Sequence, residues 1–403
     1  MEMFKRRPMK IKTIWHGIWV VMIGFWALVG PAWGEPGLTD KEILIGSCAA
    51  LEGPANFLGT QTVLGAKSYI NHINDQGGIH GRKIKLVSYD DGYEPDKAIE
   101  CFNRLKQEGV FAAGFFVGTP TGAKHAPMAE SAKIPLIGLF TGAQLLHEPF
   151  KRYVINVRAS YYDEAREQVD NLWKVMGMRK IAVIYQEDAF GVAVLEGVKL
   201  ALKKHNAAPI ALGSFKRNTL DVDQGIEQVR AANPDAVIMV GPYAPIAEIV
   251  KRGRAAKWNP IYVTVSFVGT EAYIKAMGKD GEGAVITQVV PPYNRMDLPT
   301  VALYHKNLKK YFPDAVPTFV SFEGFVNAMV LVEGLKRTGR DLTREKLIDA
   351  IESIRDLDMG LGAQLKLTYG PMDHKGFDTV YYTVVKDGQA VAFTDWEDLK
   401  KGR

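Results

Sequence analysis

Strand-like and helix-like segments alternate regularly from residue 42 onward, and this alternation constrains the fold more than any other feature of the sequence. Residues 42–51 (EILIGSCAAL) form a short apolar run typical of a buried strand. Residues 59–76 repeat apolar side chains at the spacing of one helix face, and the glycines at 77–78 are typical of a helix end. Alternation of this kind builds a parallel sheet with helices on both faces. The sequence therefore predicts an α/β fold.

The alternation falls into two series of similar size. The first continues through strand-like runs at 83–89, 112–118, 134–140 and 153–158. The second has strand-like runs at 181–185, 209–215, 236–241, 260–265 and 284–290. After Pro291 the pattern changes to three helices, at 298–312, 319–338 and 343–354, and then to an antiparallel pair at roughly 364–368 and 379–386. A length of 403 residues also favours two domains over one core.

We therefore predict two lobes, each a doubly wound, mostly parallel sheet, hinged by several crossings of the chain. The predicted bounds are 41–156 plus 291–355 for a discontinuous lobe I, and 157–290 plus about 356–395 for lobe II. The crossings are expected at 155–160 and 288–293. Ligands of open α/β sheets bind beyond the carboxyl ends of the strands, and lobes linked by short crossings can close around a solute.

The first 34 residues have the composition of an export signal. A cationic start, MEMFKRRPMKIK, is followed by an apolar stretch and by the small residues Ala32 and Gly34. We predict a signal peptide over residues 1–34, cleaved before Glu35, and a periplasmic mature protein; a retained membrane anchor is the alternative. No cysteine stands at the cleavage point, so a lipid anchor is not expected.

Most of the excess positive charge lies in that leader. The whole chain has 50 Lys and Arg against 45 Asp and Glu, a net charge of +5. Residues 1–34 hold five of the cations and one of the anions, which leaves 45 against 44, a net charge of +1, for the rest. A nearly neutral chain gives no support for nucleic-acid binding, which needs a basic face to neutralise phosphates, so nucleic acid is not an expected partner.

The sequence contains two cysteines, Cys48 and Cys101. Cys48 ends an apolar strand, and Cys101 shares a helix face with Phe102 and Leu105. An exported protein can form disulfides, but free cysteines are also among the most buried residues. We expect two buried, unpaired thiols and no metal site.

Motifs of the common enzyme classes do not occur in the sequence. GTPTGAK at 118–124 resembles a phosphate-binding loop, but it is one residue too short before its second glycine, and His125 follows Lys124. There is no dinucleotide-binding glycine motif, no nucleophile elbow and no zinc-protease motif. A polar turn explains Asp90 and Asp91 better than acid/base catalysis does. We therefore predict a protein that is not an enzyme and needs no cofactor.

Residues 73–95, INDQGGIHGRKIKLVSYDDGYEP, resemble the signature of the leucine/isoleucine/valine-binding-protein family, periplasmic solute-binding proteins that serve ABC importers. Other blocks resemble the family in the same order, at 51–54, 118–146, 154–165, 180–191 and 266–272. The resemblance implies a type I periplasmic binding protein fold that holds the solute in its cleft. It also implies permease subunits in the membrane as partners, and hydrolysis of ATP by other subunits of the importer. We expect a monomer.

The loop from Gly118 to Thr121 opens a helix after a strand, so its hydroxyls and free N–H groups suit a carboxylate; a plain N-cap is the simpler interpretation. The resemblance implies that Thr119 supplies a hydroxyl to the ligand and that an aromatic, Phe190, packs on it. Phe140 is as typical of a core as of a site. The predicted ligand-binding residues are Glu52, Phe57, Thr119, Pro120, Thr121, Phe140, Thr141, Gly142, Phe190, Tyr243, Ser266 and Phe267.

Ser266 departs from the family pattern, because amino-acid binders place a carboxylate for the α-ammonium there. A buried ammonium without a countercharge is costly. Either Glu52 or another acid substitutes, or the ligand has no amine. We predict an exported binding protein that captures a small carboxylate-bearing ligand, a branched-chain or other amino acid, and delivers it to a permease. The alternatives are an amine-free aromatic or aliphatic acid or amide as ligand, and a ligand-sensing receptor module on the same fold.

Overall fold

The computed structural model describes Met3 and residues 34–401. The chain divides into two compact units, residues 1–34 and residues 35–403, and all the elements below belong to the second. The predicted signal peptide, except for Met3 and Gly34, lies outside the described residues. Within the described part, none of the helices combines the length and apolar character needed to cross a membrane.

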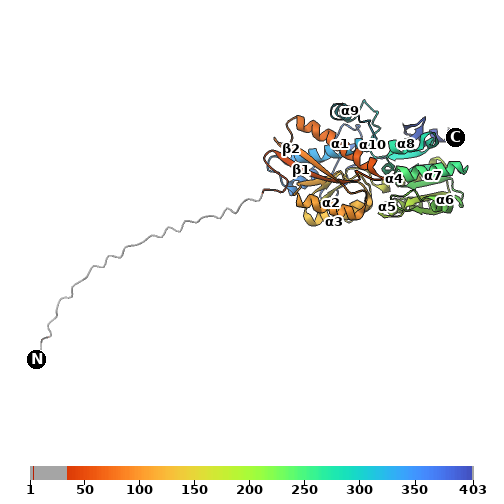
Figure 1. The fold of residues 1–403 in the computed structure, drawn as a ribbon, viewed down its shortest axis with the longest axis horizontal. Helices are drawn as coiled ribbons and strands as arrows, with labels where there is room; N and C mark the ends of the chain where they lie inside the picture. The colour runs from red at the N-terminus through yellow and green to blue at the C-terminus, as the bar shows by residue number, and fades with distance from the viewer. Residues whose placement is uncertain (1–2, 4–33, 402–403) are drawn as a thin grey trace. The chain divides into compact units, whose positions relative to one another are not determined.

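The first sheet has five strands, all parallel, in the order β2-β1-β3-β4-β5. Figure 1 labels its neighbouring strands β1 and β2. Its strands are β1 (Glu42–Ala49), β2 (Lys83–Asp90), β3 (Ala112–Gly114), β4 (Leu136–Ile137) and β5 (Val154–Ile155). The helices between them are α1 (Asn56–Asp75), α2 (Pro95–Gln107) and α3 (Thr119–Ala132). Side chains alternate between the two faces of a strand, so along β1 Ile43 packs with α1 while Cys48 packs with α2.

The second sheet has seven strands in the order β14-β13-β10-β9-β8-β6-β7. Its parallel strands are β6 (Ile181–Gln186), β7 (Leu212–Phe215), β8 (Ala236–Val240), β9 (Ile261–Thr264) and β10 (Val285–Gln288). An antiparallel hairpin, β13 (Tyr381–Lys386) and β14 (Gln389–Phe393), extends one edge. The helices of this half are α4 (Tyr161–Asp170), α5 (Ala189–Lys203), α6 (Asp223–Arg230), α7 (Tyr243–Ala255), α8 (Thr270–Met277) and α12 (Trp396–Lys401). Two mostly parallel sheets with helices on both faces confirm the predicted fold class.

Three helices return to the first sheet after β10. They are α9 (Pro299–Tyr311), α10 (Phe319–Arg337) and α11 (Arg344–Glu352). α10 lies against α1 at very short range because glycines face backbone at the crossing. A Cβ at Gly65 would collide with the carbonyl oxygen of Ser321, and one at Gly324 would collide with that of Thr62.

The predicted antiparallel pair near the C-terminus is wrong. Residues 364–368 contribute β12 (Lys366–Leu367), which pairs with β11 (Leu357–Asp358), whereas 379–386 contributes β13, which pairs with β10 and β14. The reason lies in the cores, because Leu367 is buried beside the first sheet and Val385 beside the second. The division into lobes remains a proposal, and this packing favours placing residues 357–377 in lobe I instead of lobe II.

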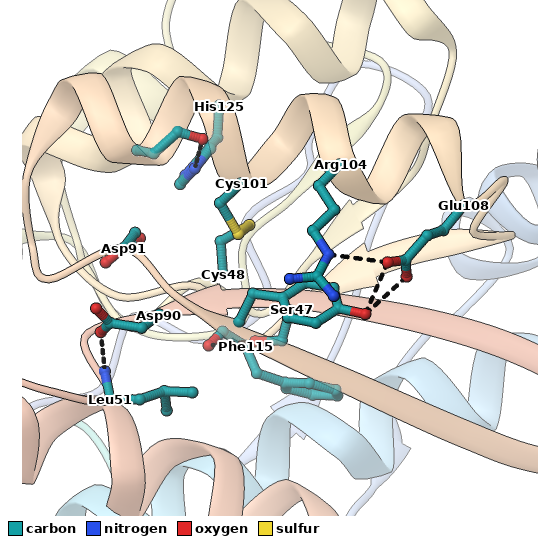
Figure 2. The surroundings of a disulfide bond; sticks show 12 residues. Ser47, Cys48, Leu51, Asp90, Asp91, Cys101, Arg104, Glu108, Phe115 and His125 are labelled. Atoms are coloured by element: carbon teal, nitrogen blue, oxygen red, sulfur yellow. Dashed lines mark hydrogen bonds and ion pairs between the residues drawn. A yellow bond between two sulfur atoms is a disulfide. The ribbon is translucent and has the colours of Figure 1, made fainter.

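The expectation of two unpaired thiols is also wrong, because Cys48 and Cys101 form a disulfide (Figure 2). Their Cα atoms are 6.0 Å apart, within the range that a disulfide spans. The sequence indicated correctly that Cys101 lies on the buried face of its helix. What no local pattern shows is that this face rests on the end of β1 that carries Cys48.

Candidate ligand-binding site

Loops at the carboxyl ends of strands from both sheets bring six of the predicted residues into one buried cluster. Thr119 begins α3 after β3, and Phe140 and Thr141 follow β4. Phe190 lies in the first turn of α5, after β6, and Ser266 and Phe267 form a 3₁₀ turn after β9. All six are at most 5% exposed. This convergence follows from parallel topology, which directs the carboxyl ends of neighbouring strands to one edge of a sheet.

Aromatic rings from both sheets meet around Phe267. Its ring centroid lies 4.6 Å from that of Phe190, 5.5 Å from that of Phe140 and 5.8 Å from that of Tyr93. Phe190 in turn lies 5.3 Å from Tyr161. Phe190 and Phe267 belong to the second sheet, and Tyr93 and Phe140 to the first, so an apolar wall crosses between the sheets. Phe140 therefore lies in the core and against the candidate site at once.

Three hydroxyls form a chain beside this wall. The Oγ1 atoms of Thr119 and Thr141 are 2.7 Å apart, and the Thr141 hydroxyl donates to the Tyr161 hydroxyl at 3.2 Å. A capping box between Ser160 and Asp163 begins α4. That cap positions Tyr161, a site residue that the sequence did not predict.

The other predicted residues of these loops, Pro120, Thr121 and Gly142, shape or hydrogen-bond the backbone of the loops and helices. The Thr121 hydroxyl donates to the carbonyl of Val117 at 2.5 Å, and Pro120 occupies the first turn of α3. The carbonyl of Gly142 accepts a hydrogen bond from the Tyr161 N–H at 2.7 Å. A Cβ at Gly142 would lie 2.9 Å from that nitrogen, so a side chain there would push α4 away from the hydroxyl chain.

A buried arginine, Arg158, lies beside the cluster and was not predicted. Its guanidinium is 2% exposed and donates to Glu164 Oε1 at 2.5 Å, to Ser266 Oγ at 2.5 Å and to Glu323 Oε1 at 3.3 Å. It also lies 5.3 Å from the ring centroid of Tyr161. One sequence signal could have found this group, since Glu323 is the single acid within FVSFEGFVNAMV, the apolar first twelve residues of α10.

Glu164 is the acid that lies directly against Ser266. Its carboxylate accepts from the Ser266 N–H at 2.8 Å, from the Ser266 hydroxyl at 2.9 Å and from the Thr287 hydroxyl at 2.5 Å, besides Arg158. Burial raises the pKa of Glu323 to about 7, and the negative charge of Glu164 adds to this effect while Arg158 opposes it. At neutral pH Glu323 is therefore only partly ionised beside Arg158.

A second set of polar contacts joins the two sheets at one rim of the cluster. Gln186 Nε2 donates to the Tyr93 hydroxyl at 3.2 Å and to Asp188 Oδ2 at 2.6 Å. Arg217 pairs with Asp188 at 3.2 Å and with Glu94 at 2.8 Å. Since Glu94 and Tyr93 precede α2 and the other residues belong to the second sheet, these bonds hold the two halves together.

The remaining predicted residues lie outside the buried cluster. The rings of Phe57 and Tyr243 are 5.9 Å apart and line a groove of about 1100 Å³ with residues of α8 and of the loop before α10. Glu52 is exposed, and only its backbone N–H is held, by Asp90 at 2.9 Å. The acid that lies beside Ser266 is Glu164, and not Glu52. Across the described residues, no group of three or more His, Cys, Asp or Glu side chains could hold a metal ion.

Comparison with known proteins identifies the family. The model of the periplasmic binding protein family matches residues 42–390. The Leu/Ile/Val-binding protein of Escherichia coli K12 is 22% identical over 251 residues, which cover 62% of this chain and 68% of that protein. A solved structure described as a possible leucine/isoleucine/valine-binding protein, from Rhodopirellula baltica SH 1, is 32% identical with a TM-score of 0.85, covering 89% of this chain and 98% of the other.

A fatty acid ABC transporter substrate-binding protein from Thermomonospora curvata shares the fold, with 23% identity, a TM-score of 0.80, and coverage of 91% of this chain and 96% of the other. The family match extends over nearly all of the described residues and includes every loop of the buried cluster. The chain belongs to the periplasmic binding protein family, among the type I members related to the Leu/Ile/Val-binding proteins.

Proposed function

We propose that this protein is the exported solute-binding component of an ABC importer. It captures a small carboxylate-bearing molecule between its two lobes by hinge closure and delivers it to permease subunits in the membrane. The observation that carries the proposal is the buried cluster, to which both sheets contribute rings and hydroxyls at the carboxyl ends of their strands. The names of the relatives, which are binding proteins for amino acids or a fatty acid, support the same role.

The proposed binding mode has two parts. The ligand's carboxylate accepts hydrogen bonds from the hydroxyls of Thr119 and Tyr161, with Thr119 exchanging its contact with Thr141 for the ligand. Thr119 lies at the start of α3, where the helix dipole favours negative charge. The apolar body packs on the rings of Phe190 and Phe267. Binding and closure are the whole mechanism, so we propose no catalytic step. The protein acts in the periplasm as a monomer after cleavage of residues 1–34.

A thermal-shift screen of the purified protein tests this function. The protein is unfolded and refolded first to remove bound solute, and then screened against amino acids, aromatic and aliphatic acids, amides and short peptides. A ligand at a hundred times its Kd adds about 2.7 kcal/mol of stability, which raises the melting temperature by a few degrees.

Thr119→Ala tests the binding mode with the ligand that the screen finds. Losing one hydroxyl that holds a carboxylate in a dry site weakens binding by about 1–3 kcal/mol, or roughly 5- to 150-fold. Thr300→Ala is the matched control, because Thr300 is also buried but its hydroxyl donates to Met359 in another part of the first sheet's core. An unchanged affinity of a folded Thr119→Ala protein would exclude the hydroxyl from the site.

A further inference from the structure

Two carboxylates that adjoin the buried cluster, Glu164 and Asp188, are already paired with arginines of the chain. Glu164, beside Ser266, accepts four hydrogen bonds, one of them from Arg158 at 2.5 Å. Two carboxylate oxygens offer about four acceptor sites. Glu164 therefore has neither a free acceptor site nor an uncompensated charge for a ligand.

The second carboxylate of the cluster, Asp188, is occupied in the same way. Its Oδ1 accepts from the N–H groups of Phe190 and Gly191 at 2.9 and 3.3 Å, which caps α5. Its Oδ2 accepts from Gln186 at 2.6 Å and from Arg217 at 3.2 Å. Glu164 and Asp188 thus both complete an ion pair with an arginine of the protein, and Asp188 also completes a helix cap.

Two further buried carboxyls lie near the cluster. Glu323 contacts the far side of the Arg158 guanidinium at 3.3 Å, and Asp91 accepts from the backbone N–H of Tyr93 at 2.9 Å. Burial raises the pKa of each to about 7, so neither holds a full negative charge at neutral pH. Asp91 Oδ2 has no hydrogen-bond partner. The other groups left to meet a ligand in this cluster are hydroxyls and rings, in the chain from Thr119 to Tyr161 and around Phe267.

We infer that the site selects carboxylic acids that lack an ammonium group, because Glu164 beside Ser266 and Asp188 at the start of α5 are each already paired with an arginine. This inference rests on the proposed function and adds the class of ligand to it. An α-ammonium would be buried beside Ser266 without a countercharge, or would have to separate Glu164 from Arg158; both cost several kcal/mol. A bare carboxylate needs only donors, which the hydroxyl chain and the start of α3 provide.

Three matched pairs test the inference on the refolded wild-type protein by calorimetric titration: leucine and isocaproate, valine and isovalerate, phenylalanine and hydrocinnamate. The members of a pair share the body and the carboxylate, and only one carries the amine. We expect the amine-free member to bind about 100-fold more tightly in any pair that binds. An amino acid that binds at least as tightly as its partner overturns the inference.

Ligands found in the wider screen test the inference in the same way. A ligand with an ammonium group overturns it, and an amine-free acid supports it. If a folded protein binds none of the solutes in the screen, the proposed function itself fails, and the inference fails with it. The two failures are therefore distinguishable.

A pair of variants tests the role of Ser266. Ser266→Asp adds a carboxylate at this position, and Ser266→Asn adds a group of similar shape without charge. We expect Ser266→Asp to shift the preference toward the amino acid of each pair by at least about tenfold, and Ser266→Asn to leave the preference unchanged. Equal shifts in both variants would assign the selectivity to shape and contradict the inference. If Ser266→Asp does not fold, the wild-type pairs still decide.

Discussion

The disulfide between Cys48 and Cys101 allows a quantitative prediction about stability. It ties the end of β1 to the buried face of α2, next to the turn in which Asp90 holds the N–H groups of Leu51 and Glu52 (Figure 2). Both cysteines are buried, so the perturbation is reduction under mildly denaturing conditions followed by refolding in the presence of reductant. The core then has to accommodate two separate thiols in place of one bond.

The size of the effect follows from the loop that the bond closes. Its cysteines are 53 residues apart. In the chain-entropy account, closing a loop of this length in the unfolded state is worth about 4 kcal/mol at 25 °C. With an unfolding entropy of about 2 cal/mol/K per residue over the described second unit, this free energy corresponds to a fall in melting temperature of about 5 °C.

Differential scanning calorimetry of the oxidised and reduced protein measures this difference. The control is the double variant Cys48→Ala with Cys101→Ala, which should melt close to the reduced protein and should not respond to reductant. A reduced protein that melts within about 1 °C of the oxidised one would refute the reasoning. It would mean that the unfolded chain already holds these segments together or that strain in the native state offsets the gain.

Three more predictions concern closure, pH and helix packing. Arg217→Ala removes the partly exposed ion pair with Glu94 that joins the two sheets. Calorimetric titration should then show ligand affinity reduced by roughly 1.5- to 5-fold. The control Arg252→Ala should leave the affinity unchanged, because the ion pairs of Arg252 stay within the half that holds the second sheet. The pKa of Glu323 is raised in the folded protein, so the folded state keeps the carboxyl proton while the unfolded state loses it. Glu323 therefore lowers the free energy of unfolding as pH rises from about 4.5 to about 7. Melting curves of Glu323→Gln should lack that part of the pH dependence, and pH profiles identical to those of the wild type would contradict this prediction. Gly65→Ala should lower the free energy of unfolding by about 2 kcal/mol or more in urea, because a methyl group would separate α1 from α10, and an unchanged midpoint would mean that the helices move apart freely.

Much of the fold could be predicted because its signals are local. Apolar residues repeat with a period of two along strands and 3.6 along helices, and the helices predicted at 298–312, 319–338 and 343–354 agree with α9, α10 and α11 to within two residues. The pairing of 364–368 with 379–386 was wrong for a related reason. β11 and β12 have two residues each, too few to show a period, and strand partners depend on contacts distant in sequence.

Within the site, the loops could be predicted but the charges could not. Thr119, Phe140 and Phe190 follow strands, and the carboxyl ends of parallel strands meet at one edge. Arg158 and Glu164 also stand near strand and helix ends, but nothing nearby in the sequence shows that Glu323, 165 residues from Arg158, completes the group. The same holds for the exposure of Glu52, which depends on how its loop rests on β2.

By itself, the sequence determined the α/β class, the order of the elements and the set of loops that gather at the carboxyl ends of the strands. These follow from periodicity and strand direction, which neighbouring residues encode. Only the tertiary structure decided that Cys48 pairs with Cys101, that Glu164 occupies the place beside Ser266, and that arginines pair with Glu164 and Asp188. Each of these depends on a distance between residues far apart along the chain, and that distance is set by how helices pack on the two sheets.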